Sequence, residues 1–233
     1  APESVLRQRR QWFAAQRDAT YEVGWTVGTR WMPVVVEASW AHLAAALGRD
    51  DLGDSPDDSY WSALMGAWMF YKWRPDVDEL PDELRGAPLA EECLRKPFRL
   101  RKRTRQFMKA SLEAPLTFLR VVDVREYEGV ELLDLLTERE TFLYDLHLSL
   151  SARRHGVLFG QMLSFGDFSM ISGMAPVPLP PLSDDDLDAI AVAARGAAVD
   201  ADARDEAGAA VSTDVDAAMA RDADVRLLRT YGD

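Results

Sequence analysis

The chain has 233 residues, of which 48% are hydrophobic and 28% are charged, and its formal net charge is −12. This size and composition predict a globular protein that is long enough to bury a core. The acidic balance opposes a general attraction to nucleic acid. No apolar run approaches the ~20 residues that a membrane-spanning helix needs, so we expect no association with a membrane.

The only cysteine is Cys93, which excludes an intrachain disulfide and a cysteine-rich zinc site. The first residues, Ala-Pro-Glu-Ser, lack the basic and apolar segments of a signal peptide. A reducing compartment suits such a chain. We therefore expect a cytoplasmic protein.

The first part of the chain is rich in tryptophan. Residues 4–47 favour a helix, which Gly24, Gly28 and Pro33 interrupt. A second helix is expected from Asp58 or Ser59 to about residue 73, with a tightly packed aromatic face. All seven tryptophans lie in this part: Trp12, Trp25, Trp31, Trp40, Trp61, Trp68 and Trp73. We expect most of them in the core, with one or two at an interface.

A basic segment follows at residues 95–109. Pro97 suits the first turn of a helix, and Pro115 ends it because a proline disfavours helical backbone in the residue before it. One face of this helix is expected to be mainly apolar and to be buried: Leu100, Thr104, Phe107, Met108, Ser111 and Leu112. The other face carries the candidate binding residues for nucleic acid or a protein partner: Arg99, Arg101, Lys102, Arg103, Arg105 and Lys109.

Residues 116–173 favour short strands. Val121, Val122 and Val124 have β-branched side chains, and the pattern around Gly166 is typical of a hairpin. We expect five strands at about 117–126, 130–136, 140–146, 156–164 and 167–173, curled into a small barrel. The leucines between residues 132 and 146 could equally form the stripe of a helix, so periodicity alone leaves both alternatives open for 130–150.

The chain ends in an acidic segment rich in Ala and Asp, which follows the rigid Pro-rich stretch 176–181. Asp184, Asp185 and Asp186 suit the positive end of a helix better than a magnesium site. The expected fold class is α+β. Its parts are a Trp-rich helical region (1–114), a five-stranded antiparallel β-barrel (115–182) and an acidic helical tail (183–233).

Several short motifs resemble a known family. They run in order as Trp68-Met-Phe-Tyr71, Ala114-Pro-Leu-Thr-Phe118, Asp134-Leu-Leu-Thr137, Gly156-Val-Leu-Phe159, Ile171-Ser-Gly173 and Pro178-Leu-Pro-Pro181. Together they resemble the helical segment and small β-barrel of uncharacterised bacterial proteins that often carry a C-terminal zinc-binding SEC-C motif. The resemblance covers roughly residues 60–182 and implies a fold rather than an activity. The Cys and His cluster of SEC-C is missing, and Glu138-Arg139 stands where that family usually has Gly.

No catalytic or metal-binding group can be identified in the sequence. His42, His147 and His155 have no Cys or His at ligand spacing, so we expect no metal and no other cofactor. The Ser, Asp and His residues at 149–155 and 164–167 lack the strand–turn–helix of a nucleophile elbow. Gly156 and Gly160 are not followed by the Lys-Ser/Thr ending of a phosphate loop.

We therefore expect a non-catalytic interaction protein that binds a partner protein through the helical part and the barrel. The alternative is a module for single-stranded RNA or DNA, which would use the basic helix and the barrel face. A third interpretation is structural, because the cations of the basic helix could pair with acidic segments of the same chain, such as residues 76–79 or the tail. The sequence does not define an oligomeric state.

Overall fold

The computed structural model describes residues 2–46, 61–96, 100–175, 185 and 192. The acidic tail apart from residues 185 and 192, Arg99 and the expected helix caps at Asp58 and Ser59 lie outside these residues. The described residues fall into two compact units. Of the described residues, the first unit contains those up to 43, 61–115 and 161–175, and the second contains 44–46, 116–160, 185 and 192. Among the described helices, none is both long and apolar enough to cross a membrane.

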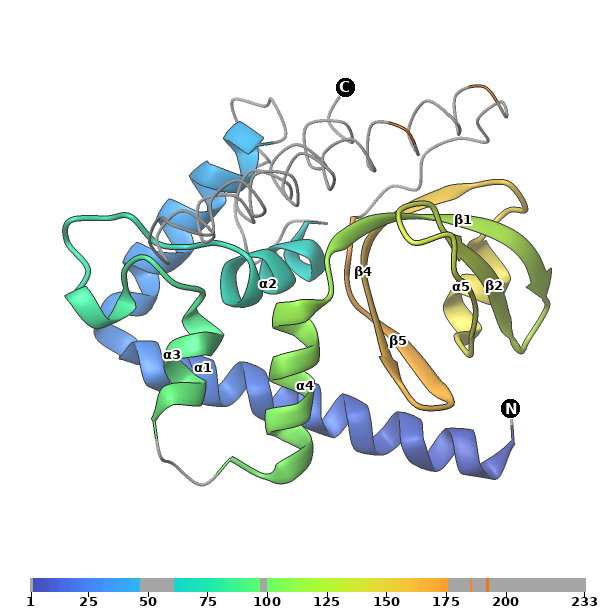
Figure 1. Ribbon diagram of the computed structural model, residues 1–233, viewed down its shortest axis with the longest axis horizontal. Coiled ribbons are helices and arrows are strands. Elements are labelled where there is room, and N and C mark those ends of the chain that lie inside the picture. The colour runs from blue at the N-terminus through green and yellow to red at the C-terminus, as the bar shows by residue number, and fades with distance from the viewer. Residues whose placement is uncertain (1, 47–60, 97–99, 176–184, 186–191, 193–233) are drawn as a thin grey trace, which may run out of the picture. The chain divides into compact units, whose positions relative to one another are not determined.

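Helix α1 (Glu3–Ala46) bends at Gly28, as Figure 1 shows. The backbone of Gly28 has φ 77° and ψ 157°, a conformation that favours glycine because it lacks a Cβ. The predicted interruption therefore falls at this glycine. Before the bend, one face of the helix is buried at intervals of four residues: Ala15, Ala19, Val23 and Val27. These small side chains allow other elements of the first unit to approach α1 closely.

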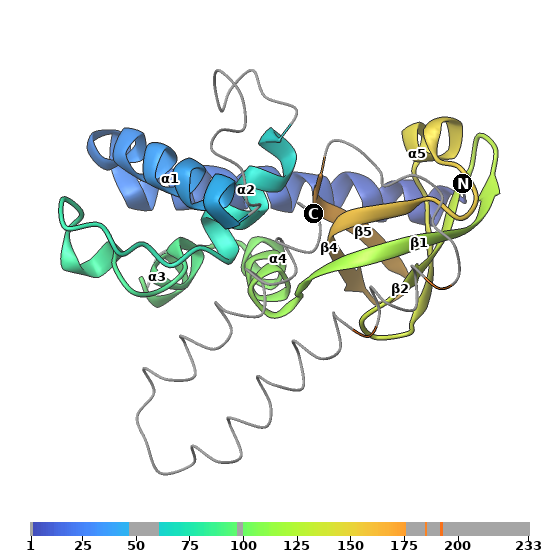
Figure 2. The same ribbon diagram turned by 90° about the horizontal axis from the view of Figure 1, so that it is seen from above.

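Four further helical elements belong to the first unit: α2 (Ser62–Tyr71), the 3-10 helix η1 (Asp82–Leu84), α3 (Leu89–Arg95) and α4 (Lys102–Glu113). Figure 2 shows α3 and α4 on the same side of α1. The core residues of α2 include Trp68, which is 1% exposed. Trp61 and Trp73 are also buried. The expectation of core tryptophans is confirmed for these three.

A five-stranded antiparallel sheet follows, with strand order β3-β2-β1-β4-β5. The strands are β1 (Leu116–Arg125), β2 (Gly129–Asp134), β3 (Glu140–Leu143), β4 (Val157–Phe165) and β5 (Phe168–Met174). The register pairs Val130 of β2 with both Val124 of β1 and Leu143 of β3. The predicted number of strands is confirmed, and so is the hairpin turn at Gly166, where φ is 64°. The predicted positions are approximately correct, but β2 ends at Asp134 instead of 136 and β3 ends at Leu143 instead of 146.

The prediction of a closed barrel is wrong. Strands β3 and β5 lie at opposite edges of the sheet and do not pair with each other. Closure needs long, tilted strands that return to the first edge, whereas β3 has only 4 residues. The chain then forms the short helix α5 (Leu146–Ser151) in place of more strand, and the Asp145 carboxylate accepts a hydrogen bond from the Leu148 amide at 3.0 Å.

The helical alternative for residues 130–150 is also wrong, because β2 and β3 form a hairpin there. Asp134 stabilises its turn by accepting hydrogen bonds from the Thr117 hydroxyl at 2.6 Å and the Leu136 amide at 2.9 Å. Glu138 takes the left-handed conformation with φ 56°, which glycine adopts more easily. These hydrogen bonds explain how the hairpin turns without a glycine at this position.

A candidate interaction surface on helices α1 and α4

Helix α4 has one buried and one charged face. Thr104, Phe107, Met108 and Ser111 are buried, as the apolar spacing predicts. The predicted start at Pro97 is wrong, because Arg101 has an extended backbone (φ −56°, ψ 145°) and caps a helix that begins at Lys102. The predicted end before Pro115 is confirmed.

The C-terminal end of α4 is held in place by side chains from other elements. The Gln161 amide Nε2 of β4 donates hydrogen bonds to the carbonyl oxygens of Ser111 at 2.7 Å and Ala114 at 2.8 Å. The Lys72 ammonium group donates to the Leu112 carbonyl at 3.0 Å. These contacts satisfy carbonyl groups that a helix end otherwise leaves without partners. The orientation of the charged face of α4 within the first unit is therefore well defined.

The candidate cations lie where the amphipathic pattern places them. Arg101, Lys102, Arg103 and Lys109 are exposed, and Arg105 is half-buried. Lys102, Arg105 and Lys109 follow one another at helical spacing along the outer face. We call these three residues the cation row. Arg99 lies outside the described residues.

The expected charge partners of α4 are mostly missing among the residues that the structure describes. Arg101 pairs with Asp18 of α1, with 3.3 Å between Nη1 and Oδ2. Within the described ranges, no carboxylate forms an ion pair with the cation row or with Arg103. In the acidic loop 76–79, Asp78 pairs instead with Arg85 at 3.5 Å. The acidic loop 76–79 therefore neutralises little of the positive charge of α4.

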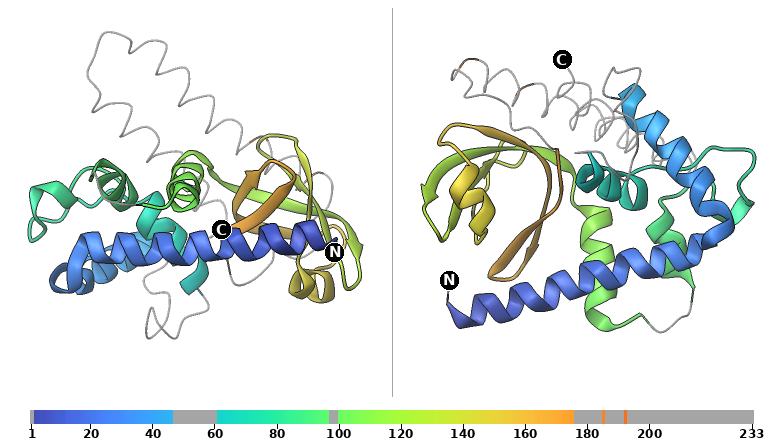
Figure 3. Two further views of the ribbon diagram at one scale, coloured as in Figure 1. Left: turned by 90° about the horizontal axis from the view of Figure 1, so that it is seen from below. Right: turned by 180° about the vertical axis from the view of Figure 1, so that it is seen from behind.

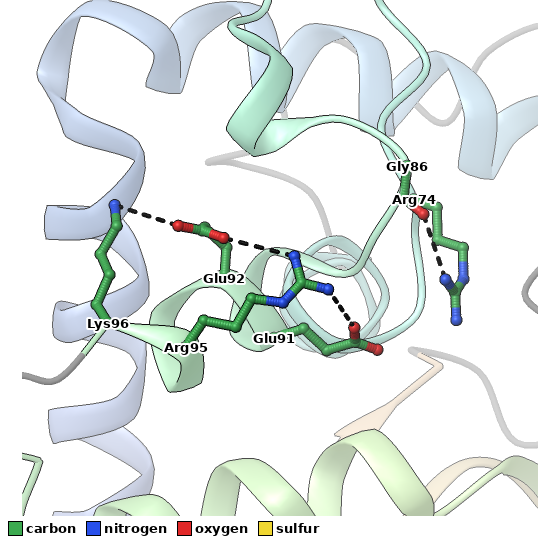
Figure 4. Close-up of polar contacts among 6 residues, drawn as sticks. All are labelled: Arg74, Gly86, Glu91, Glu92, Arg95 and Lys96. Atoms are coloured by element: carbon green, nitrogen blue, oxygen red, sulfur yellow. Dashed lines mark hydrogen bonds and ion pairs between the residues drawn. The ribbon is translucent and has the colours of Figure 1, made fainter. Parts of the chain in front are cut away.

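The first two cations of the basic segment differ from those of α4. Figure 4 shows Arg95 and Lys96 paired with glutamates of α3 itself. Arg95 lies 3.5 Å from Glu91 and 3.6 Å from Glu92, and Lys96 lies 3.8 Å from Glu92. These pairs at helical spacing neutralise the start of the basic segment locally. The candidate surface therefore begins at Arg101.

Arg103 rests on a stack of aromatic rings. Its guanidinium carbon lies 5.8 Å from the centre of the Trp12 ring. Trp12 in turn stacks on Phe165 with 3.6 Å between ring centres and 12° between planes. Phe165 continues to Phe107 in the core, with ring centres 6.4 Å apart. Arg103 therefore has an aromatic partner, which contributes about 0.5–1 kcal/mol at an exposed site.

A groove separates α1 from α4, which cross each other in Figure 3. Its volume is about 400 Å³, and its lining combines both signs of charge with an aromatic ring and a hydroxyl: Arg17, Asp18, Tyr21, Glu22, Arg101 and Thr104. Thr104 forms part of the buried wall, being 2% exposed. Arg17 and Arg101 are 81% and 84% exposed in their side chains. The groove is thus a polar, open site rather than an apolar pocket.

Two aromatic residues of α1 extend this surface into solvent. Tyr21 is 67% exposed, and Trp25, one helical turn further along, is 75% exposed. Large exposed aromatic side chains are enriched where proteins bind partners. The sequence prediction named neither Tyr21 nor Arg17 as a binding residue and treated Trp25 only as one of seven tryptophans. The four-residue spacing of Arg17, Tyr21 and Trp25, opposite the small buried stripe, is the signal that could have identified them.

His42, Ser164 and Cys93, whose side chains could carry chemistry, each interact with neighbouring residues of the fold. His42 stacks on Trp68 with 5.8 Å between ring centres. Ser164 shares a hydrogen bond with Ser169 across the β4–β5 hairpin. Burial raises the pKa of Cys93, and the nearby Glu22 carboxylate raises it further, although the Thr26 hydroxyl, Lys96 and Arg105 act in the opposite direction. Within the part of the chain that the structure describes, no three His, Cys, Asp or Glu residues converge as metal ligands.

Comparison with protein families matches part of the chain. Residues 83–178 are similar to a family of unknown function, DUF7986. This segment covers less than half of the chain and includes α3, α4 and the whole sheet. No curated protein and no solved structure matches the chain. The resemblance to the SEC-C-associated proteins stays a prediction.

Proposed function

We propose that this protein is a non-catalytic interaction protein, and that it binds an acidic segment of a partner protein on the surface formed by α1 and α4. The observation that carries the proposal is the cation row, which has no carboxylate partner among the described residues and lies on the helix that also borders the groove. Complementary charges speed the association of two proteins and select the correct partner. Tyr21 and Trp25 add the exposed aromatic area that gives such surfaces affinity.

The composition of the groove favours a protein over a nucleic acid. Asp18 and Glu22 line it together with Arg17 and Arg101, so the charges of its lining sum to about zero. A phosphate backbone places a charge at every nucleotide and would meet both carboxylates. The net charge of −12 also repels a polyanion at long range. A protein segment can place a few acidic side chains on the cations and neutral side chains elsewhere.

Single-stranded nucleic acid remains the second candidate, and the cation row is the observation that favours it. Lys102, Arg105 and Lys109 could contact successive phosphates, while exposed aromatic rings stack on bases. The part of this hypothesis that relied on a barrel face no longer applies, because the sheet is open. The proposal for a protein partner likewise now concerns the helical surface alone.

We also propose that the protein acts in the cytoplasm, in keeping with its one cysteine and the absence of a spanning helix among the described helices. The non-catalytic role is proposed because the titratable residues at the groove show no arrangement of nucleophile, base and orienting group.

A comparison of two charge reversals tests the proposal. Lys102→Glu with Lys109→Glu changes the cation row, and Arg139→Glu with Arg153→Glu makes the same change in charge at exposed sites of the second unit. Each form of the full chain is used to capture proteins and nucleic acids from a lysate of its native cells. We expect a specific protein to bind the wild type and the Arg139/Arg153 variant but not the Lys102/Lys109 variant. Capture of nucleic acid alone, weakened steeply by salt, would establish the second candidate instead.

A further inference from the structure

The groove contains two arginines that point toward one carboxylate. Arg17 comes from α1, and Arg101 caps the N-terminus of α4. Asp18 lies between them: its Oδ1 is 3.9 Å from Nη2 of Arg17, and its Oδ2 is 3.3 Å from Nη1 of Arg101. One internal carboxylate therefore holds two guanidinium groups from different helices close to each other.

Most of the binding capacity of these two arginines is unused. A guanidinium group has five N–H donors, and each of these arginines directs only one nitrogen at Asp18. Both side chains are more than four-fifths exposed, so their remaining donors face solvent. An exposed ion pair of this kind contributes little to stability, so a second carboxylate can compete with Asp18 at small cost.

We propose that Arg17 and Arg101 form a recognition site for one Asp or Glu side chain of the partner protein, and that Asp18 occupies this site until the partner binds. The inference rests on the proposed function and specifies how the partner is anchored. The incoming carboxylate replaces the contacts of Asp18 with bidentate hydrogen bonds to the guanidinium groups. The ring of Tyr21, at the edge of the groove, packs against the aliphatic part of that side chain.

The surroundings select a carboxylate over a phosphate. A partner carboxylate adds one negative charge beside Asp18 and Glu22, which line the groove. A phosphate group adds up to two negative charges, so the same two carboxylates repel it more strongly. The size of the groove, about 400 Å³, suits one or two side chains of a partner rather than an extended strand of nucleic acid.

This arrangement predicts effects of opposite sign for neighbouring residues. Arg17→Gln with Arg101→Gln removes the recognising groups and should weaken binding. Asp18→Asn removes the internal competitor and should strengthen it. A surface that attracted its partner by overall charge alone would respond to Lys102→Gln with Lys109→Gln as strongly as to the paired arginine change, because both remove two positive charges.

The test uses a short fluorescein-labelled peptide of alternating Glu and Ala, with both ends blocked so that only side chains carry charge. Fluorescence anisotropy is measured with the full chain, and circular dichroism checks that each variant keeps its fold. We expect the arginine pair variant to lose about tenfold in affinity or more, which is the loss of roughly one charge-assisted contact. Asp18→Asn should gain a few-fold, and the same peptide with Gln in place of Glu should not bind.

Three outcomes would overturn the inference. The first is peptide binding that is indifferent to the arginine pair, and the second is weaker binding by Asp18→Asn. The third is competition by inorganic phosphate at concentrations where acetate has no effect. The capture experiment on the cation row is read separately. If a partner protein depends on Lys102 and Lys109 but the peptide fails these tests, the proposed function stands and the arginine site is refuted.

Discussion

The packing of α2 against β5 depends on the absence of a side chain at Gly173. A Cβ atom at this position would overlap the Cβ of Ala67 and would lie 2.9 Å from the carbonyl oxygen of Ala63. Ordinary contacts between carbon atoms are 3.5–4.0 Å, so Gly173→Ala must open the helix–strand contact by about 1 Å. Overpacking of this kind typically destabilises by 1–3 kcal/mol. We therefore expect the free energy of unfolding to fall by about 2 kcal/mol.

Gly66→Ala is the matched control, because it makes the same chemical change in α2 at a position where, among the described residues, only the adjacent residues and the backbone of α2 itself approach the new Cβ. Alanine is the better helix former, so this variant should gain about 0.5–1 kcal/mol. Urea unfolding, followed by tryptophan fluorescence, measures the free energy of unfolding of both variants. The signal reports on the right part of the chain, because all seven tryptophans and both glycines belong to the first unit. If Gly173→Ala and the wild type were equally stable, with the same dependence of the unfolding free energy on urea concentration, the close packing would be refuted.

Three further predictions concern Gly129, Tyr71 and the metal content of the protein. Gly129→Ala should lower the melting temperature and destabilise by roughly 2–3 kcal/mol, since the new Cβ would overlap the Leu143 carbonyl oxygen; unaltered melting would show that β2 and β3 pair differently. Tyr71→Phe should stabilise by about 1 kcal/mol, because the buried Tyr71 hydroxyl has no hydrogen-bond partner among the described residues. Burial, with a smaller contribution from Cys93, raises the pKa of Tyr71 above the ordinary value near 10. The fold therefore favours the protonated side chain, and the wild type should lose stability as the pH rises above that value. Chemical unfolding across the alkaline range should show a steeper loss for the wild type than for the Phe variant. Elemental analysis of untagged protein should find no stoichiometric zinc; one zinc per chain would mean that His42, His147 or His155 binds metal together with carboxylates.

Local sequence signals predicted the secondary structure of this protein well. The hairpin at Gly166 and the bend at Gly28 occur at residues whose backbone conformations favour glycine. The amphipathic spacing of α4 correctly placed its buried residues Thr104, Phe107, Met108 and Ser111 and the exposed Lys102, Arg103 and Lys109. Leu112 and Arg105 are half-buried, and Leu100 precedes the helix. These features depend on residues that are close in sequence, which is why a single sequence contains them.

Long-range features were less predictable. Whether β3 reaches β5 depends on strand length and on where α5 begins, and the leucines of residues 143–150 suit a strand or a helix equally well. The groove combines residues that lie more than eighty positions apart, such as Asp18 and Arg101. A basic segment shows that cations are present, but only the packing of α4 beside α1 shows that Arg101 pairs with Asp18, whereas the cation row has no carboxylate partner among the described residues.

Site-specific photocrosslinking tests the central claim most directly. A photoreactive phenylalanine derivative replaces Tyr21 on the proposed surface or Tyr127 in the turn between β1 and β2, and these tyrosines are 67% and 70% exposed. Irradiation in native cells, followed by separate analysis of crosslinked protein and nucleic acid, compares two equally accessible positions. The proposed function predicts a crosslink to one specific protein from position 21 and none to that protein from position 127. The same crosslinked species from both positions, or nucleic acid alone from position 21, would contradict it.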